Sequence, residues 1–103
     1  MFNLTFFAQN SQPTSFFIQS MIHIDSQEQT NQMELKLREN QFIKMCRIDF
    51  NTKTLLIITQ NVDKVNSDIL KLWLEENYSK TSCVNIGVYG KDKMLKYPLT
   101  NCK

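Results

Sequence analysis

Residues 42–60 read FIKMCRIDFNTKTLLIITQ, and this stretch decides the fold. Its first part, 42–50, mixes apolar and charged positions, which is typical of a half-buried strand. The polar residues 51–53 (NTK) form a turn, and the continuous apolar run at 54–60 indicates a central strand. Two strands joined by so short a turn predict a β-hairpin.

A strand and a helix are expected before the hairpin. Residues 16–24 (FFIQSMIHI) are rich in β-forming residues and predict a strand. Ser26 and Gln29 follow with the spacing of a capping box, in which each side chain accepts a hydrogen bond from the other's free backbone N–H. A helix should therefore begin after Ser26, with Met33 and Leu37 on one face at i, i+4 spacing.

A second helix and a fourth strand are expected after the hairpin. Asn66 or Ser67 is a suitable cap for a helix over 68–78. Residues 82–89 (SCVNIGVY) alternate with period two and predict a strand, and the remainder forms a loop or one short edge strand. The residues expected on the apolar face of this helix are Ile69, Leu72 and Trp73, flanked by Leu70 and Leu74.

The order strand, helix, strand, strand, helix, strand is the βαββαβ arrangement of the ferredoxin-like fold. We therefore predict an α+β sandwich with an antiparallel sheet and two helices on one face. The 103 residues fit one domain, placed at 16–90, with a C-terminal tail at 91–103. This fold hosts many functions, so it does not by itself indicate one.

Within this arrangement, residues 22–86 resemble the heavy-metal-associated domain of copper chaperones and metal-pumping ATPases. The hairpin of that family carries an apolar-Asp-apolar-x-Thr-Lys segment, matched here by 48–53 (IDFNTK). A Val-Ser-like lead into the second helix of the family is matched by 65–67 (VNS). The positions matched in the first helix are Met33, Glu34 and Leu37.

The chain departs from that family at the metal-binding loop. The family's Cys-x-x-Cys positions hold Ser26 and Gln29, and neither is a thiolate ligand for Cu(I) or zinc. The resemblance therefore implies a scaffold with a degenerate metal site, and we expect no cofactor. Met21 and His23 are weak candidates for a non-standard Met/His site, because a lone histidine at a strand end is more often structural or solvated.

The N-terminus and the cysteines bear on the cellular compartment. Residues 1–9 (MFNLTFFAQ), followed by the polar stretch 10–15, are similar to the end of a secretory signal, although the basic region is absent. We therefore expect a remnant of an export signal plus linker at 1–15 and a periplasmic or exported protein. The alternative is an ordinary terminus of a cytoplasmic protein.

Three cysteines occur without metal-site spacing. In an exported protein, Cys83 and Cys102 are the better candidates for a disulfide, because Cys46 stands among apolar strand residues and should be buried. In a cytosolic protein all three would stay reduced. They could also be plain core or surface residues.

Composition argues against several functions. The net charge is +2, the basic residues are dispersed, and the aromatic signature of RNA-binding domains with this fold is absent. We expect no nucleic-acid partner. No apolar run reaches the roughly 18–20 residues of a membrane-spanning helix. The sequence shows no nucleophile or carboxylate-pair motif, so we expect no enzymatic activity.

A binding role is favoured by the strand at 54–60. Alternation places Leu55 and Ile57 on one face of the sheet, and Leu56 and Ile58 on the other. In this fold one face carries no helices, and Phe17 would add apolar surface to it. We expect a protein partner or a second copy to bind there through Leu56, Ile58 and Phe17. Alternatively, residues 1–9 or 94–99 fold back over that face. The second hypothesis is metal or small-ligand binding at the loop of Met21, His23, Ser26 and Gln29.

Overall fold

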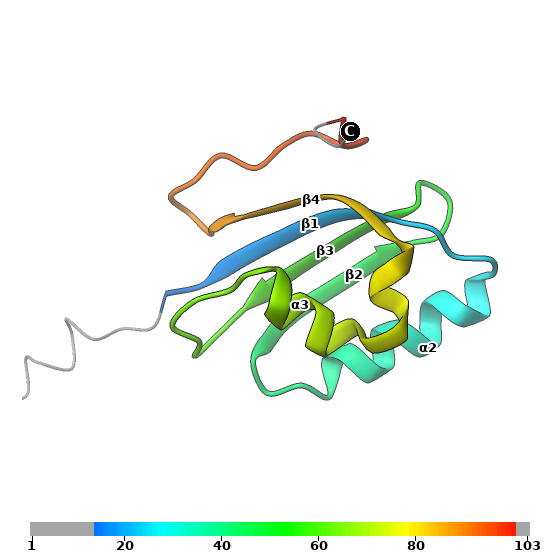
Figure 1. Cartoon of the computed structure of the whole chain (residues 1–103), viewed down its shortest axis with the longest axis horizontal. Helices are drawn as coiled ribbons and strands as arrows, with labels where there is room; N and C mark the ends of the chain where they lie inside the picture. The colour runs from blue at the N-terminus through cyan, green and yellow to red at the C-terminus, as the bar shows by residue number, and fades with distance from the viewer. Residues whose placement is uncertain (1–13, 101–103) are drawn as a thin grey trace, which may run out of the picture.

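The computed structural model describes residues 14–100, which form one antiparallel sheet with helices on one side. The elements are β1 (Phe16–Ile22), α2 (Gln27–Arg38), β2 (Ile43–Asp49), β3 (Thr54–Thr59), α3 (Ser67–Leu74), the 3₁₀ helix η1 (Glu75–Lys80) and β4 (Thr81–Val88). The strand order is β2-β3-β1-β4. Figure 1 shows α2 and α3 on the same face of this sheet. The predicted ferredoxin-like α+β fold is confirmed.

The main core lies between the sheet and the helices. Strand alternation directs Leu55 and Ile57 of β3 into it, and both are 0% exposed. The helix α2 contributes Met33 and Leu37, the pair expected from i, i+4 spacing. Burial of such apolar side chains is the main term that stabilises the domain. The other core residues are Ile18, Ile22, Ile24, Ile43, Cys46, Ile48, Leu70 and Leu74.

Both helices begin at the predicted caps. The Oγ of Ser26 accepts a hydrogen bond from the backbone N–H of Gln29 at 3.1 Å. The Oε1 of Gln29 accepts from the N–H of Asp25 at 3.0 Å, one residue before the N–H that a standard capping box uses. The Oδ1 of Asn66 accepts from the N–H of Ile69 at 3.0 Å and caps α3.

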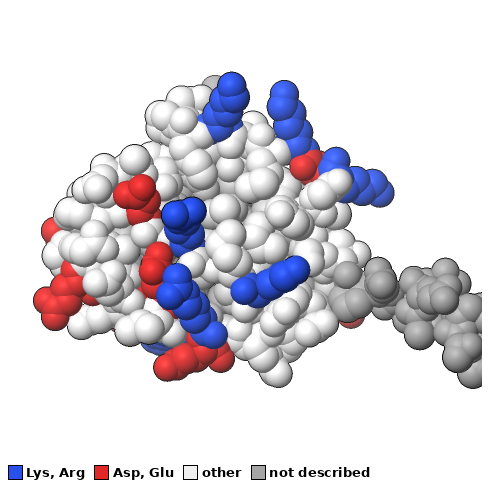
Figure 2. All heavy atoms as spheres, turned by 180° about the vertical axis from the view of Figure 1, so that it is seen from behind, with Lys and Arg blue, Asp and Glu red and all other residues white. Residues whose placement is uncertain are grey.

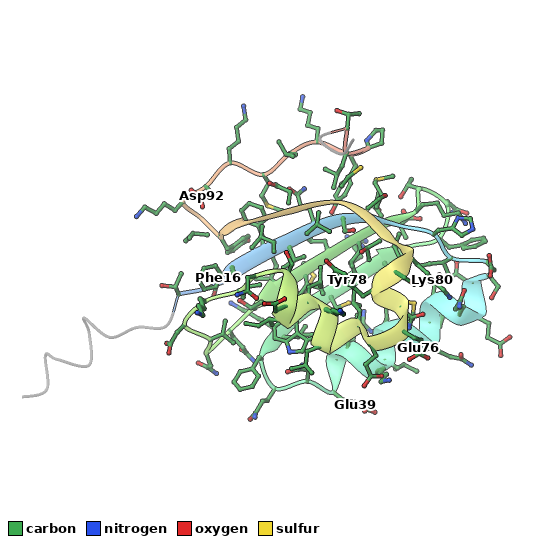
Figure 3. The ribbon with its side chains drawn as sticks, in the orientation of Figure 1. Phe16, Glu39, Glu76, Tyr78, Lys80 and Asp92 are labelled. Carbon is green, nitrogen blue, oxygen red and sulfur yellow. The ribbon has the colours of Figure 1, made fainter. Side chains whose placement is uncertain are left out.

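The second helix differs from the prediction in its end and in its buried face. It ends at Leu74, because Glu75 adopts a left-handed backbone (φ 56°), and the 3₁₀ helix η1 follows, where Figure 3 labels Tyr78 and Lys80. The helix buries Leu70 and Leu74, whose i, i+4 spacing puts both over the sheet. Leu72, predicted to be apolar core, is 73% exposed because it lies about 200° around the helix from each.

Neither helix is a candidate membrane span. Between residues 14 and 100, no helix combines the length and the apolar character needed to cross a bilayer.

Candidate binding site on the open sheet face

The face of the sheet opposite the helices is organised as rows of cross-strand neighbours. Because paired residues of antiparallel strands point to the same side, the register defines which side chains meet. The two central rows are Met45, Ile58, Phe17 and Gly87, and Arg47, Leu56, Gln19 and Asn85. The first row is therefore mostly apolar, whereas the second carries polar side chains on three of its four strands.

The segment after β4, residues 91–100, returns over the β1–β4 half of this face. A Cβ atom on Gly87 would lie 2.6 Å from the ring of Phe17 and 3.0 Å from the Cβ of Asp92, so only glycine allows this close packing. Phe17 is 1% exposed and Ile58 is 5% exposed. Two of the three expected interface residues are therefore buried, and hydrogen bonds from Leu95 and Tyr97 show that part of the segment 94–99 lies on this face. Leu56 alone remains half-exposed.

Gln19 fastens this segment to the sheet. Its Nε2 donates to the backbone carbonyl of Leu95 at 2.8 Å, and its Oε1 accepts from the N–H of Leu95 at 2.9 Å. The same Oε1 accepts from the Nδ2 of Asn85 at 3.0 Å. The Gln19 side chain thus offers Leu95 one acceptor and one donor, as a neighbouring strand would. A glutamine in the middle of a central strand is satisfied in this way although it is 1% exposed.

Tyr97 lies where the part of the face that is covered by residues 91–100 meets β3. Its hydroxyl donates to the backbone carbonyl of Leu55 at 2.7 Å. Burial raises the pKa of Tyr97, so the phenol stays protonated and keeps this donor at neutral pH. The phenolic group is therefore committed to the sheet, and the ring forms a wall beside β3.

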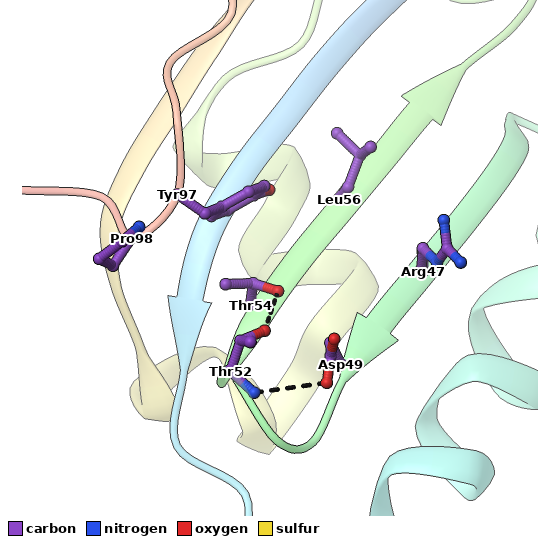
Figure 4. A pocket seen from close by; sticks show the side chains of 7 residues that line it. All are labelled: Arg47, Asp49, Thr52, Thr54, Leu56, Tyr97 and Pro98. Carbon is purple, nitrogen blue, oxygen red and sulfur yellow. Dashed lines mark hydrogen bonds between the residues drawn. The ribbon is translucent and has the colours of Figure 1, made fainter.

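A hollow remains on the β2–β3 half of the face, next to this wall (Figure 4). Its volume is about 570 Å³. Leu56 forms the apolar floor, and Tyr97 with Pro98 bounds one side. The full lining is Arg47, Asp49, Thr52, Thr54, Leu56, Tyr97 and Pro98. We call this the β2–β3 hollow.

The polar groups of the β2–β3 hollow differ in how far their bonding capacity is used. The Oδ1 of Asp49 accepts the N–H groups of Asn51 and Thr52 at 2.9 and 3.3 Å, which fixes the hairpin turn. The hydroxyls of Thr52 and Thr54 bond each other at 2.9 Å. The exposed guanidinium of Arg47, in contrast, has no ion pair or side-chain hydrogen bond with any residue from 14 to 100. Arg47 is the cation available to a ligand here.

Charge on this side of the molecule is mixed. Figure 2 shows the face from behind, with basic and acidic side chains interspersed over a mainly uncharged surface. They do not gather into a single basic stripe of the kind that follows a nucleic-acid backbone.

Part of each edge of the sheet is capped by side chains. At β2, the carboxylate of Glu34 accepts from the N–H of Ile48, and Arg38 donates to the carbonyl of Cys46 at 3.2 Å. Glu34 and Arg38 also pair with each other at 3.4 Å, one turn apart on α2. The helix thus supplies the donor and the acceptor that a further strand would use. Such caps protect an edge from pairing with another chain.

At the end of β4, the Oδ2 of Asp92, labelled in Figure 3, accepts from the N–H of Val88 at 2.7 Å. The carbonyl of Val88 accepts from the N–H groups of Lys91 and Asp92 at 3.1 and 2.8 Å. The middle of β2 and the end of β4 are therefore capped against strand addition.

In the loop where the resemblance predicts a degenerate metal site, the side chains of Ser26 and Gln29 cap the helix. The side-chain oxygens of Ser26 and Gln29 accept hydrogen bonds from backbone N–H groups. His23 is exposed, with its Nε2 3.6 Å from the Oδ1 of Asp25, and Met21 lies on the open face beside Thr54. Over the described part of the chain, no group of three His, Cys, Asp or Glu side chains is placed to hold a metal ion. A Met21/His23 site stays a prediction.

The cysteines have different environments. Cys46 is free and 2% exposed, as expected from its strand, and burial raises the pKa of its thiol to about 12. A thiol of that pKa is a poor nucleophile at neutral pH. Cys83 is disulfide-bonded. Cys102 lies outside the described residues, as does the expected export remnant up to residue 13, and both expectations stay predictions.

Sequence reasoning did not single out Gln19, Arg47 or Tyr97. Of these three residues, only Gln19 could have been noticed in the sequence, because a glutamine within the apolar strand 16–22 requires a hydrogen-bond partner. Arg47 and Tyr97 are 50 residues apart in the sequence, and only the return of the C-terminal segment brings them to one hollow.

Comparison with known proteins gives no relative: no protein-family model, curated protein or solved structure matches the chain. The resemblance to the heavy-metal-associated domain therefore stays a prediction from the sequence.

Proposed function

We propose that this chain is a non-catalytic binding module, built on a degenerate heavy-metal-associated scaffold, which holds a protein partner in the β2–β3 hollow. The observation that carries the proposal is a hollow of about 570 Å³ with an apolar floor at Leu56, beside an arginine that lacks an ion pair within residues 14–100. Concave apolar surface next to a few polar groups is the usual form of a binding site.

The chemistry of the lining supports a protein as the partner. Aromatic residues and arginine are enriched at protein interfaces, and Tyr97 and Arg47 stand on the two sides of the hollow. The caps at the middle of β2 and at the end of β4 disfavour the addition of a partner strand at those points. The state of Asp49 supports binding over chemistry, since its Oδ1 is engaged in the hairpin turn, and the thiol of Cys46 is buried in the core on the other face of the sheet.

A library of random linear peptides tests the proposal and does not require the partner to be identified first. Peptides are selected on the immobilised full chain and then measured against Leu56→Glu, which puts a charge on the floor of the hollow. Leu72→Glu is the matched control, because Leu72 is equally apolar and 73% exposed on the helix side. Circular dichroism of each variant establishes that it is folded.

We expect selected peptides to bind the wild-type chain and the Leu72→Glu variant equally, and to lose binding to Leu56→Glu. The proposal is wrong if no peptide is enriched, or if the enriched peptides bind folded Leu56→Glu as well as they bind the wild type. If the wild type dimerises as its concentration rises and Leu56→Glu abolishes the dimer, the partner is a second copy of the chain and not another protein.

A further inference from the structure

We infer that the β2–β3 hollow takes an extended segment of the partner in which an apolar side chain lies over Leu56 and a nearby carboxylate binds Arg47. This inference rests on the proposed function and names the chemistry of the partner. It follows from the charges that remain unpaired, the shape of the hollow and the way the chain's own C-terminal segment lies on the same face.

The apolar part of the segment is set by the floor and the wall. Leu56 is half-buried, and the hydroxyl of Tyr97 is turned to the carbonyl of Leu55, so the hollow meets the Tyr97 ring and Pro98. An aliphatic or aromatic side chain on this floor would remove apolar surface of both partners from water. A polar side chain would have to give up its hydration there without a matching set of partners.

The sign of the charge is set by the difference between Arg47 and Asp49. Neither Arg47 nor Asp49 has an ion pair among residues 14–100, but Asp49 already accepts two backbone N–H groups through Oδ1, whereas Arg47 has no side-chain hydrogen bond there. A guanidinium presents a planar fork of donors that matches a carboxylate. An acidic residue therefore complements this hollow, and a basic residue placed at the same point would meet Arg47 with like charge.

An extended conformation fits the length of the hollow. The residues of β2 that line the hollow are Arg47 and Asp49, a span of about 7 Å at roughly 3.3 Å per residue. That span accommodates about three residues of an extended chain. In such a chain alternate side chains point to the same side, so the apolar residue and the carboxylate are expected at positions i and i+2.

The C-terminal segment is an internal precedent for this mode of docking. It lies on the neighbouring half of the face without belonging to the sheet, and Leu95 is held through its backbone by the side chain of Gln19. The β2–β3 hollow is the remaining trough beside it, bounded by Tyr97 and Pro98 of that same segment.

Charge reversal at Arg47 tests the inference. The random peptide library is selected in parallel on the wild-type chain, on Arg47→Glu and on Lys71→Glu, the last as a control because Lys71 is an exposed cation on α3. We expect wild type and Lys71→Glu to enrich peptides with an apolar residue and Asp or Glu at i+2. Arg47→Glu should enrich Lys or Arg at that position. In the best wild-type peptide, a Glu→Gln change should weaken binding about two- to fivefold for the wild type and not for Arg47→Gln.

The outcomes separate this inference from the proposed function. If the wild type enriches no peptide, the proposed function fails and the inference fails with it. If peptides are enriched and depend on Leu56, but their acidic content is the same for wild type and Arg47→Glu, only the inference is overturned. Comparable circular dichroism spectra for the three chains ensure that unfolding does not explain a difference.

Discussion

The replacement Gln19→Leu should release the C-terminal segment from the sheet. It keeps the approximate volume of the side chain and removes both hydrogen bonds to Leu95, which measure 2.8 and 2.9 Å. At about 0.5–1.5 kcal/mol each, these bonds stabilise the docked segment by about 1–3 kcal/mol. Asn85 also loses the acceptor that it reaches at 3.0 Å. We expect the free energy of unfolding to fall by about 2–4 kcal/mol in total. The loss is limited to this range because water partly rehydrates the backbone and amide groups that the change leaves without a partner.

Two measurements follow this change. Urea unfolding gives the loss of stability, and amide hydrogen exchange followed by NMR gives the opening of the segment at Leu95, whose N–H is bonded to Gln19. Weakening the attachment by about 1–3 kcal/mol should speed exchange at Leu95 by about 5- to 150-fold. Gln60→Leu is the matched control, since the Gln60 side chain makes one exposed hydrogen bond, to the carbonyl of Gln41. It should change stability by less than about 0.5 kcal/mol.

The reasoning about the segment is refuted if Gln19→Leu and Gln60→Leu unfold at the same urea concentration and leave Leu95 equally protected. The segment would then be held on the sheet by groups other than Gln19.

Three further predictions concern the open face, the sheet edge and the buried thiol. Ile58→Ser should lower the free energy of unfolding by about 2–5 kcal/mol, because Ile58 is 5% exposed. Leu56→Ser on the same strand and face should lower it by about 1 kcal/mol, because Leu56 is only half-buried. Equal losses in urea unfolding would contradict this difference in burial. Glu34→Ala should lower the free energy of unfolding by about 1–3 kcal/mol, because the N–H of Ile48 loses its acceptor. The control Glu76→Ala, at an exposed position of η1, should lower it little. Equal urea midpoints for the two variants would show that the edge cap does not contribute to stability. Cys46 should resist iodoacetamide in the folded chain and react after unfolding. Since its pKa is raised from 9.0 to about 12, its contribution to stability should be complete below pH 9 and fall as the pH rises towards 12, and rapid labelling of the native thiol at pH 8 would disprove its burial.

Local sequence patterns were sufficient to predict the main architecture. The hairpin at 42–60 and the opposite directions of Leu55 and Leu56 follow from period-two alternation, which the backbone of a strand imposes. The caps at Ser26 and Asn66 follow from side chains that compete for the free N–H groups of a helix end. These features depend on residues close together in the chain, so their physical causes are present in a short window of sequence.

The errors and omissions involve longer-range packing. The apolar cluster of α3 allows more than one buried face, and contact with the sheet selects Leu70 and Leu74 in place of Leu72. The C-terminal segment has neither helical nor strand periodicity, so its position depends on Gln19 and Tyr97 meeting across the fold. The β2–β3 hollow exists only once that segment has docked, and no single stretch of the sequence indicates it.

The most direct test of the central claim is an NMR titration of the isotope-labelled full chain with the tightest peptide from the library. We predict that the largest changes in amide chemical shift occur at Arg47, Leu56, Lys96, Tyr97 and Leu99, around the β2–β3 hollow. Changes confined to the helix side around Leu72, or to the loop of His23 and Gln29, would place the binding surface elsewhere and contradict the account.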